Sequence, residues 1–186
     1  MRKTYHPVSM AIHWLIVVLL LISIPMGKIM TEREFDSLNN VLYTLHWSIG
    51  LTVLALMVVR LGFRLVVPAP KPAASLEPWQ RFLSHWTHIA IYVMLIVTPI
   101  LGWLGKSAFG ASAQGINVFY LFYVPTLVPR NKEMAEFYFE LHEISSFILI
   151  GLIVLHVAGA LYHAVVQKDG VVGRMGLGKK IAEPEA

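Results

Sequence analysis

Eight histidines are the residues of this sequence with the widest choice of chemistry. They stand in a chain of 186 residues that is 56% hydrophobic and contains no cysteine. The lack of thiols excludes disulfides, cysteine-ligated zinc, iron–sulfur clusters, thiol catalysis and covalently attached haem. Neutral imidazole nitrogens remain available as metal ligands. The sequence therefore directs attention to metal or haem binding by histidine.

Four of the histidines have a spacing that predicts two pairs. Fourteen residues separate His142 from His156, close to four helical turns, so both rings fall on nearly the same helix face about 21 Å apart. If successive helices are antiparallel, His46 shares the outer level with His142, and His13 shares the inner level with His156. Facing pairs at two depths suit two bis-histidine haems, which leave no open coordination position and so favour electron transfer. Without cysteine, both would be non-covalent haem b.

Further residues are candidates for contacts to these cofactors. Arg60 follows His46 by another fourteen residues, so it falls at the inner level, where it could pair with a haem propionate or snorkel to the interface as an anchor. Gly50, one turn after His46, could make room for a haem, although such glycines more often serve helix packing. His85 and His88 have no matching partner on another span. They could contact propionates or a quinone headgroup, or form an interfacial cluster.

Other readings of the histidines remain open. A single histidine inside a membrane often only bonds a backbone carbonyl of a neighbouring helix. Zinc prefers three or four ligands in one site, often with carboxylates, whereas these histidines lie at two levels with no acid between them. His163 could replace His156, but it lies twenty-one residues from His142, a rise of about 31 Å that nearly spans the hydrocarbon core.

The elements that must position these residues are apolar helices. Only 14% of the residues are charged, against about 25% in a typical soluble domain. Four stretches reach the roughly 20 residues needed to cross a bilayer: residues 8–30, 41–67, 84–104 and 142–166. A shorter aromatic stretch, 116–128, is expected at the membrane interface. The fold class is thus an all-α integral membrane four-helix bundle.

The basic residues predict the orientation of the bundle. Of the 15 lysines and arginines, an arrangement with the N-terminus inside puts about ten on the cytoplasmic side and leaves about five outside. Both termini are therefore expected in the cytoplasm. The modest net charge of +4 gives no reason to expect nucleic-acid binding. We expect one membrane domain over residues 1–170 and a flexible cytoplasmic tail over residues 171–186.

An ordered set of motifs carries a family resemblance over about residues 5 to 170. The motifs are residues 12–15, 45–46 with Ser48 and Gly50, 57–61, 85–88 with Tyr92 and Pro99, 141–143, and 155–156 with Ala160 and His163. Taken together, the chain resembles the bacterial four-helix cytochrome b561 family, which includes the superoxide:ubiquinone oxidoreductase type.

The resemblance implies a multi-pass protein of the bacterial inner membrane with two b haems. Its axial ligands fall on His13, His46, His142 and His156. It also implies electron transfer across the plasma membrane between a periplasmic donor, for which superoxide is one candidate, and the quinone pool, ubiquinone or another quinone. An oxidoreductase of the superoxide:quinone type is one outcome. A haem-binding anchor subunit that passes electrons for a partner dehydrogenase is the alternative. The sequence leaves the oligomeric state open.

Overall fold

Four long helices make up most of the chain in the computed structural model, which describes residues 4–32, 37–70, 76–112 and 114–176. They are α1 (Pro7–Glu32), α2 (Ser37–Val66), α3 (Pro78–Phe109) and α4 (Lys132–Leu161), which continues into the π-helical turn η1 (Tyr162–Gln167). All four are long and apolar enough to cross a membrane. The prediction of an all-α membrane four-helix bundle is thereby confirmed.

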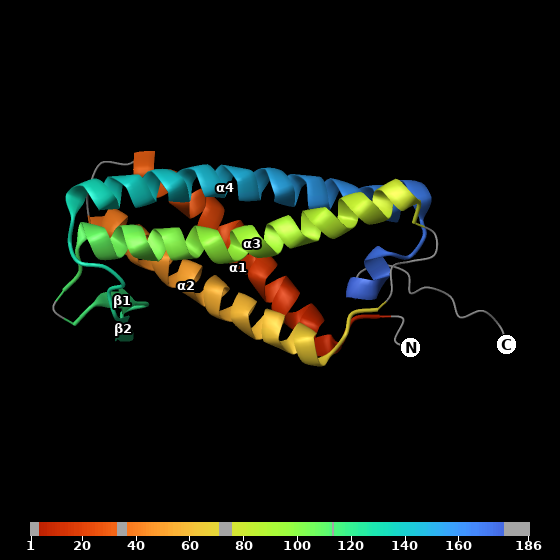
Figure 1. The fold of residues 1–186 in the computed structure, drawn as a ribbon, viewed down its shortest axis with the longest axis horizontal. Helices are drawn as coiled ribbons and strands as arrows, with labels where there is room; N and C mark the ends of the chain where they lie inside the picture. The colour runs from red at the N-terminus through yellow and green to blue at the C-terminus, as the bar shows by residue number, and fades with distance from the viewer. Residues whose placement is uncertain (1–3, 33–36, 71–75, 113, 177–186) are drawn as a thin grey trace.

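The helices are arranged as two pairs. α3 and α4 lie side by side along the long axis, and α1 and α2 form the second pair, which contacts the first through α2 and α3 (Figure 1). The buried core between them is small and consists of apolar side chains: Ile16, Ile49, Val53, Met57, Leu95 and Leu149. Many large apolar side chains on the outer faces of the helices are exposed. Such faces are the surfaces that contact lipid in a membrane protein.

The two ends of the bundle differ. One end carries a hairpin of β1 (Ile116–Val118) and β2 (Phe122–Val124), whose strands pair antiparallel (Figure 1); we call it the hairpin end. At the other end, the backbone N–H of Tyr5 donates to the carbonyl of Arg174 at 3.2 Å; we call it the terminal end. The stretch expected at the membrane interface thus contains this hairpin.

Side chains from α2 hold the hairpin in place. The indole N–H of Trp47 donates to the carbonyl of Asn117 at 2.7 Å, and the hydroxyl of Ser48 accepts from the backbone N–H of Phe119 at 2.9 Å. Phe119 and Tyr120 both have positive φ angles, 51° and 61°, which is uncommon for aromatic residues. The backbone N–H of Tyr120 in turn donates to the side chain of Asn117 at 2.7 Å. These bonds stabilise a turn that the aromatic residues alone disfavour.

The helices α3 and α4 extend beyond the apolar stretches recognised in the sequence. α3 begins at Pro78, where Glu77 and Gln80 form a capping box, and α4 begins after Asn131, whose side chain accepts from the N–H of Met134 at 3.1 Å. The added turns mix charged residues with apolar ones, so hydropathy marks only the part of each helix that is continuously apolar. His142 therefore lies ten residues inside α4 rather than near its start.

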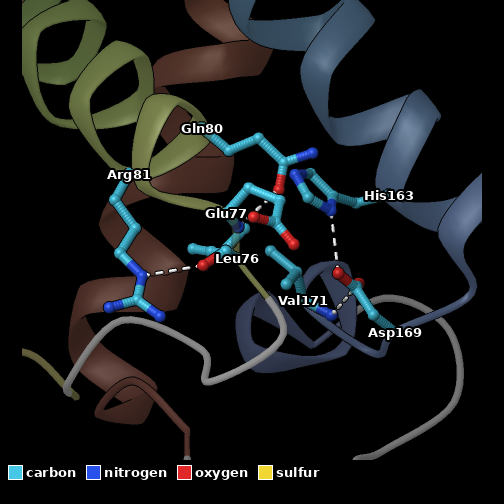
Figure 2. Close-up of polar contacts among 7 residues, drawn as sticks. All are labelled: Leu76, Glu77, Gln80, Arg81, His163, Asp169 and Val171. Atoms are coloured by element: carbon cyan, nitrogen blue, oxygen red, sulfur yellow. Dashed lines mark hydrogen bonds and ion pairs between the residues drawn. The ribbon is translucent and has the colours of Figure 1, made fainter.

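A short helix follows directly after residue 170, where the membrane domain was expected to end. Residues 172–175 form a 3₁₀ helix, η2 (Val172–Met175), and the carbonyl of Met175 accepts from the indole N–H of Trp14 at 2.9 Å. The segment folds back onto the bundle because polar backbone groups find partners there. Upstream, Asp169 accepts from His163 at 2.8 Å and from the N–H of Val171 at 3.1 Å (Figure 2). Residues 177–186 of the expected flexible tail lie outside the described residues.

Candidate functional site: two histidine pairs across the bundle

His46 of α2 and His142 of α4 face each other towards the hairpin end of the bundle. Their ring centroids lie 6.1 Å apart and their planes are nearly perpendicular, at 84°. We call these two residues the hairpin pair.

Each ring of the hairpin pair is held by a backbone carbonyl. Nδ1 of His142 lies 2.8 Å from the carbonyl oxygen of Thr98, and Nδ1 of His46 lies 3.1 Å from that of Ser23. Because a carbonyl only accepts, Nδ1 carries the proton in both rings. The lone pair then belongs to Nε2, which is the tautomer that binds a metal.

A glycine makes room for each of these rings. A Cβ atom on Gly102, one turn after Thr98, would lie 3.1 Å from two ring atoms of His142. A Cβ atom on Gly27, one turn after Ser23, would lie 3.0 Å from the ring of His46. Each histidine therefore fits a notch formed by a hydroxyl residue and a glycine four residues later on the neighbouring helix.

His13 of α1 and His156 of α4 form the second pair, towards the terminal end. Their ring centroids lie 6.4 Å apart at an interplanar angle of 81°; we call them the terminal pair. The ring of His88 lies 5.0 Å from that of His156, and its Nδ1 donates to the carbonyl of Ser84 at 2.5 Å. No residue in the described ranges accepts a hydrogen bond from His13 or His156.

Both pairs have a spacing that suits an iron atom between them. Two imidazoles whose nitrogens each lie about 2 Å from one metal have centroids about 6 Å apart. Among the described helices, α4 packs closely only along α3. The histidines that face His142 and His156 lie on α2 and α1, which α4 does not pack against closely. No group of three or more metal-binding side chains occurs in the part of the chain that the structure describes. The donor set fits two-coordinate axial ligation rather than a tetrahedral zinc site.

Arg60, Gly50 and His85, the other residues predicted to contact a cofactor, differ in what surrounds them. Arg60 donates from Nε to the hydroxyl of Tyr92 and from Nη1 to the carbonyl of Ser9, both at 2.8 Å. Gly50 faces α3, where a Cβ atom would lie 4.0 Å from Pro99. This position corresponds to a glycine in the contact between two helices. His85 is exposed and stacks edge-on against the neighbouring Trp86 ring at 5.6 Å. The structure brings neither His85 nor Gly50 against a histidine pair.

Ser23, Thr98 and Gly102 are site residues that the sequence reasoning missed. A sequence signal for them exists: a Ser or Thr and a Gly four residues apart recur in α1 and α3, and a proline stands between them in both helices. The signal is weak, because it becomes meaningful only when a histidine from another helix faces the notch.

A hollow of about 510 Å³ opens at the hairpin end and carries two cations, Lys106 and Arg130. Its described lining contains no carboxylate, and its walls include Phe109 and Val128. Nζ of Lys106 lies 4.5 Å from the ring centre of Trp47, the residue that follows His46. The hollow is thus positively charged, and one of its two cations lies over the ring of Trp47.

Four spanning helices with facing histidine pairs define an integral membrane protein of the cytochrome class. Comparison with known protein families supports this class, because the family model for prokaryotic cytochrome b561 matches residues 4–178. The chain therefore belongs to the prokaryotic cytochrome b561 family, and it is a bacterial membrane electron-transfer protein that binds haem b.

Individual relatives cover nearly the whole chain. Cytochrome b561 homolog 2 of Escherichia coli is 31% identical over 182 residues, 97% of this chain and 95% of the relative. The probable superoxide oxidase CybB of Yersinia pestis is 28% identical over 177 residues, 94% of this chain and 97% of the relative. Cytochrome b562 of Cereibacter sphaeroides is 26% identical over 180 residues, 92% of this chain and 94% of the relative.

Proposed function

We propose that this protein is a dihaem cytochrome of the bacterial inner membrane that carries electrons between a donor at the hairpin end and a quinone at the terminal end. The hairpin pair, His46 and His142, holds one haem b, and the terminal pair, His13 and His156, holds the other. The observation that carries the proposal is the spacing of the two pairs, with ring centroids 6.1 and 6.4 Å apart. When bound, haem b supplies a reversible one-electron couple between ferric and ferrous iron.

The chain's own residues orient and shield the cofactors. The carbonyls of Ser23 and Thr98 fix the tautomer and ring direction of the hairpin pair. Arg60, bonded to Tyr92 and to the backbone of α1 near the terminal pair, is available to turn its guanidinium toward a propionate. His88, whose ring lies 5.0 Å from His156, is a candidate for propionate or quinone contact. His85, three residues earlier on α3, is a weaker candidate for the same role.

The electron donor is proposed to approach from the periplasm. The distribution of lysine and arginine favours cytoplasmic termini, which makes the hairpin end periplasmic. The hollow lined by Lys106 and Arg130 would attract an anion to that end. Superoxide is the candidate donor, and a relative of similar length bears the name of a probable superoxide oxidase. The acceptor is then ubiquinone or another quinone at the cytoplasmic, terminal end.

Haem content and two reduction assays test this proposal together. The protein purified in detergent should contain two haems per chain by pyridine haemochrome assay and show a b-type band in its reduced-minus-oxidised spectrum. Stopped-flow mixing with superoxide should reduce the haems, and added quinone should reoxidise them. One haem per chain would refute the dihaem arrangement. Two haems that neither superoxide nor quinol reduces would instead support an anchor subunit for a partner dehydrogenase.

A further inference from the structure

The two histidine pairs differ in how the protein holds their outer nitrogens. Both rings of the hairpin pair donate from Nδ1 to a carbonyl, at 2.8 Å to Thr98 and 3.1 Å to Ser23. Neither ring of the terminal pair has such an acceptor within the described residues. The asymmetry comes from α1 and α3, which carry a notch opposite each ring of the hairpin pair.

Charge differs between the two levels as well. Arg60 donates to the carbonyl of Ser9, which lies one helical turn before His13 on α1. This bond holds the Arg60 guanidinium near the level of the terminal pair. Among the described residues, no lysine or arginine donates a hydrogen bond to the backbone within one turn of His46 or His142. Lys106, at the hairpin end, is partly buried, and its Nζ lies over the Trp47 ring.

Both differences act on a redox couple in a known direction. Donation from Nδ1–H to a carbonyl makes Nε2 a more basic ligand, and a more basic ligand stabilises ferric iron relative to ferrous iron. A nearby fixed cation favours the ferrous state, because reduction removes one positive charge. Second-shell hydrogen bonds and local charge are among the means by which proteins tune haem potentials.

On the basis of the proposed dihaem function, we infer that the hairpin pair holds the haem of lower potential and the terminal pair the haem of higher potential. Ser23 and Thr98, through their carbonyls, and Gly27 and Gly102, through the space they leave, are positioning residues that set this order. With haem bound at both pairs, one electron passing from the hairpin level to the terminal level would oxidise the first site, reduce the second and move downhill. The fold thus favours electron flow from the hairpin end to the terminal end.

Redox titration of the purified holoprotein, followed at the haem absorption band, tests the order of potentials. Two one-electron waves are expected. His142→Ala should lose one haem and, with it, the wave of lower potential. A protein with two haems in which His142→Ala removes the wave of higher potential would overturn the inference while leaving the proposed function intact. Fewer than two haems in the unaltered protein would instead refute the proposed function.

Gly102→Ala tests the cause of the order. Its Cβ would lie 3.1 Å from ring atoms of His142, so the ring must shift and its bond to Thr98 weaken. The midpoint potential of the lower wave should then rise by about 59 mV for one electron, which is about a tenfold fall in the ratio of oxidised to reduced haem at a fixed potential. Gly151→Ala is the matched control, because Gly151 lies on α4 with no atom within 4 Å of its Cβ position.

The outcome of the glycine variants is decisive in each case. A Gly102→Ala protein that keeps both haems and both original potentials would refute the role of the notch. A shift of the higher wave alone would refute it too. If Gly102→Ala loses the hairpin-level haem, Gly27→Ala, whose Cβ would lie 3.0 Å from the His46 ring, provides the second measurement, and the His142→Ala assignment still decides the order.

Discussion

Haem counts in double histidine variants give the sharpest test of how the four proposed ligands are paired. His46 and His142 share one level, and His156 lies fourteen residues from His142, a rise of about 21 Å along α4. A haem that bridges a pair with centroids 6.1 Å apart cannot also reach a ligand that far along the axis. In the proposed arrangement, each haem therefore depends on two histidines of one level and on none of the other.

The expected magnitudes follow from this geometry. His46→Ala and His142→Ala should each reduce the haem content from two per chain to one, with half the b-band absorbance. The double variant His46→Ala/His142→Ala should still contain one haem, because both changes affect the same site. The double variant His142→Ala/His156→Ala should contain none. The second double variant removes His156 rather than His13. If His13 were removed instead, the ring of His88 would still lie beside that of His156 and could take its place as a ligand.

The assay is the pyridine haemochrome stoichiometry of each purified variant, with bis-histidine ligation of the remaining haem checked by low-spin electron paramagnetic resonance. Gly151→Ala is the control and should keep both haems, because no atom lies within 4 Å of its Cβ position. A same-level double variant that loses both haems, or a cross-level double variant that keeps one, would refute the pairing.

Three further predictions concern packing, the hairpin and charge. Gly105→Ala should destabilise the bundle by about 1–3 kcal/mol, seen as a lower thermal midpoint by circular dichroism, because its Cβ would lie 2.7 Å from the ring of Phe139. Trp47→Phe should cost about 1 kcal/mol and speed amide exchange in the hairpin, because it removes the 2.7 Å bond to the carbonyl of Asn117. Lys106→Glu should slow haem reduction by superoxide several-fold at low ionic strength, with the difference fading in high salt as charges are screened over about 8 Å or less.

Each of these predictions has a result that contradicts it. An unchanged midpoint for Gly105→Ala, equal to that of the open-space control Gly151→Ala, would show that α3 and α4 separate there without cost. If the hairpin amides of Trp47→Phe exchange as slowly as those of the unaltered protein, Trp47 does not hold the strands. A Lys106→Glu effect that persists in high salt would indicate a local structural change rather than attraction of an anion.

Hydropathy located all four helices but not their full lengths. The spanning stretches were predicted from runs of apolar residues, and each lies mostly within an observed helix. α3 and α4 extend further because their first turns are capped by Glu77 and Asn131, and caps act through hydrogen bonds that hydropathy does not measure. The 3₁₀ helix η2 was missed for a related reason, since its partners on α1 are remote in sequence.

The candidate site, like the fold, is predictable from the sequence only in part. Helical periodicity along α4 relates His142 to His156, and antiparallel topology assigns each a partner. The structure places those partners 6.1 and 6.4 Å away, while the assignment of all four as haem ligands stays a prediction. The nearness of His88 to the terminal pair was not expected, because it depends on the rotation of α3 about its own axis.

The class of protein follows from the chain alone, because the lack of cysteine, the four spanning stretches and the two depths of histidine depend on composition and helical period. Which atoms surround each ring depends on how the helices pack. The carbonyls of Ser23 and Thr98 reach the hairpin pair because Gly27 and Gly102 let neighbouring helices approach to within contact of an imidazole. Such contacts depend on the rotation and separation of helices, which result from packing across the whole bundle rather than from any local pattern.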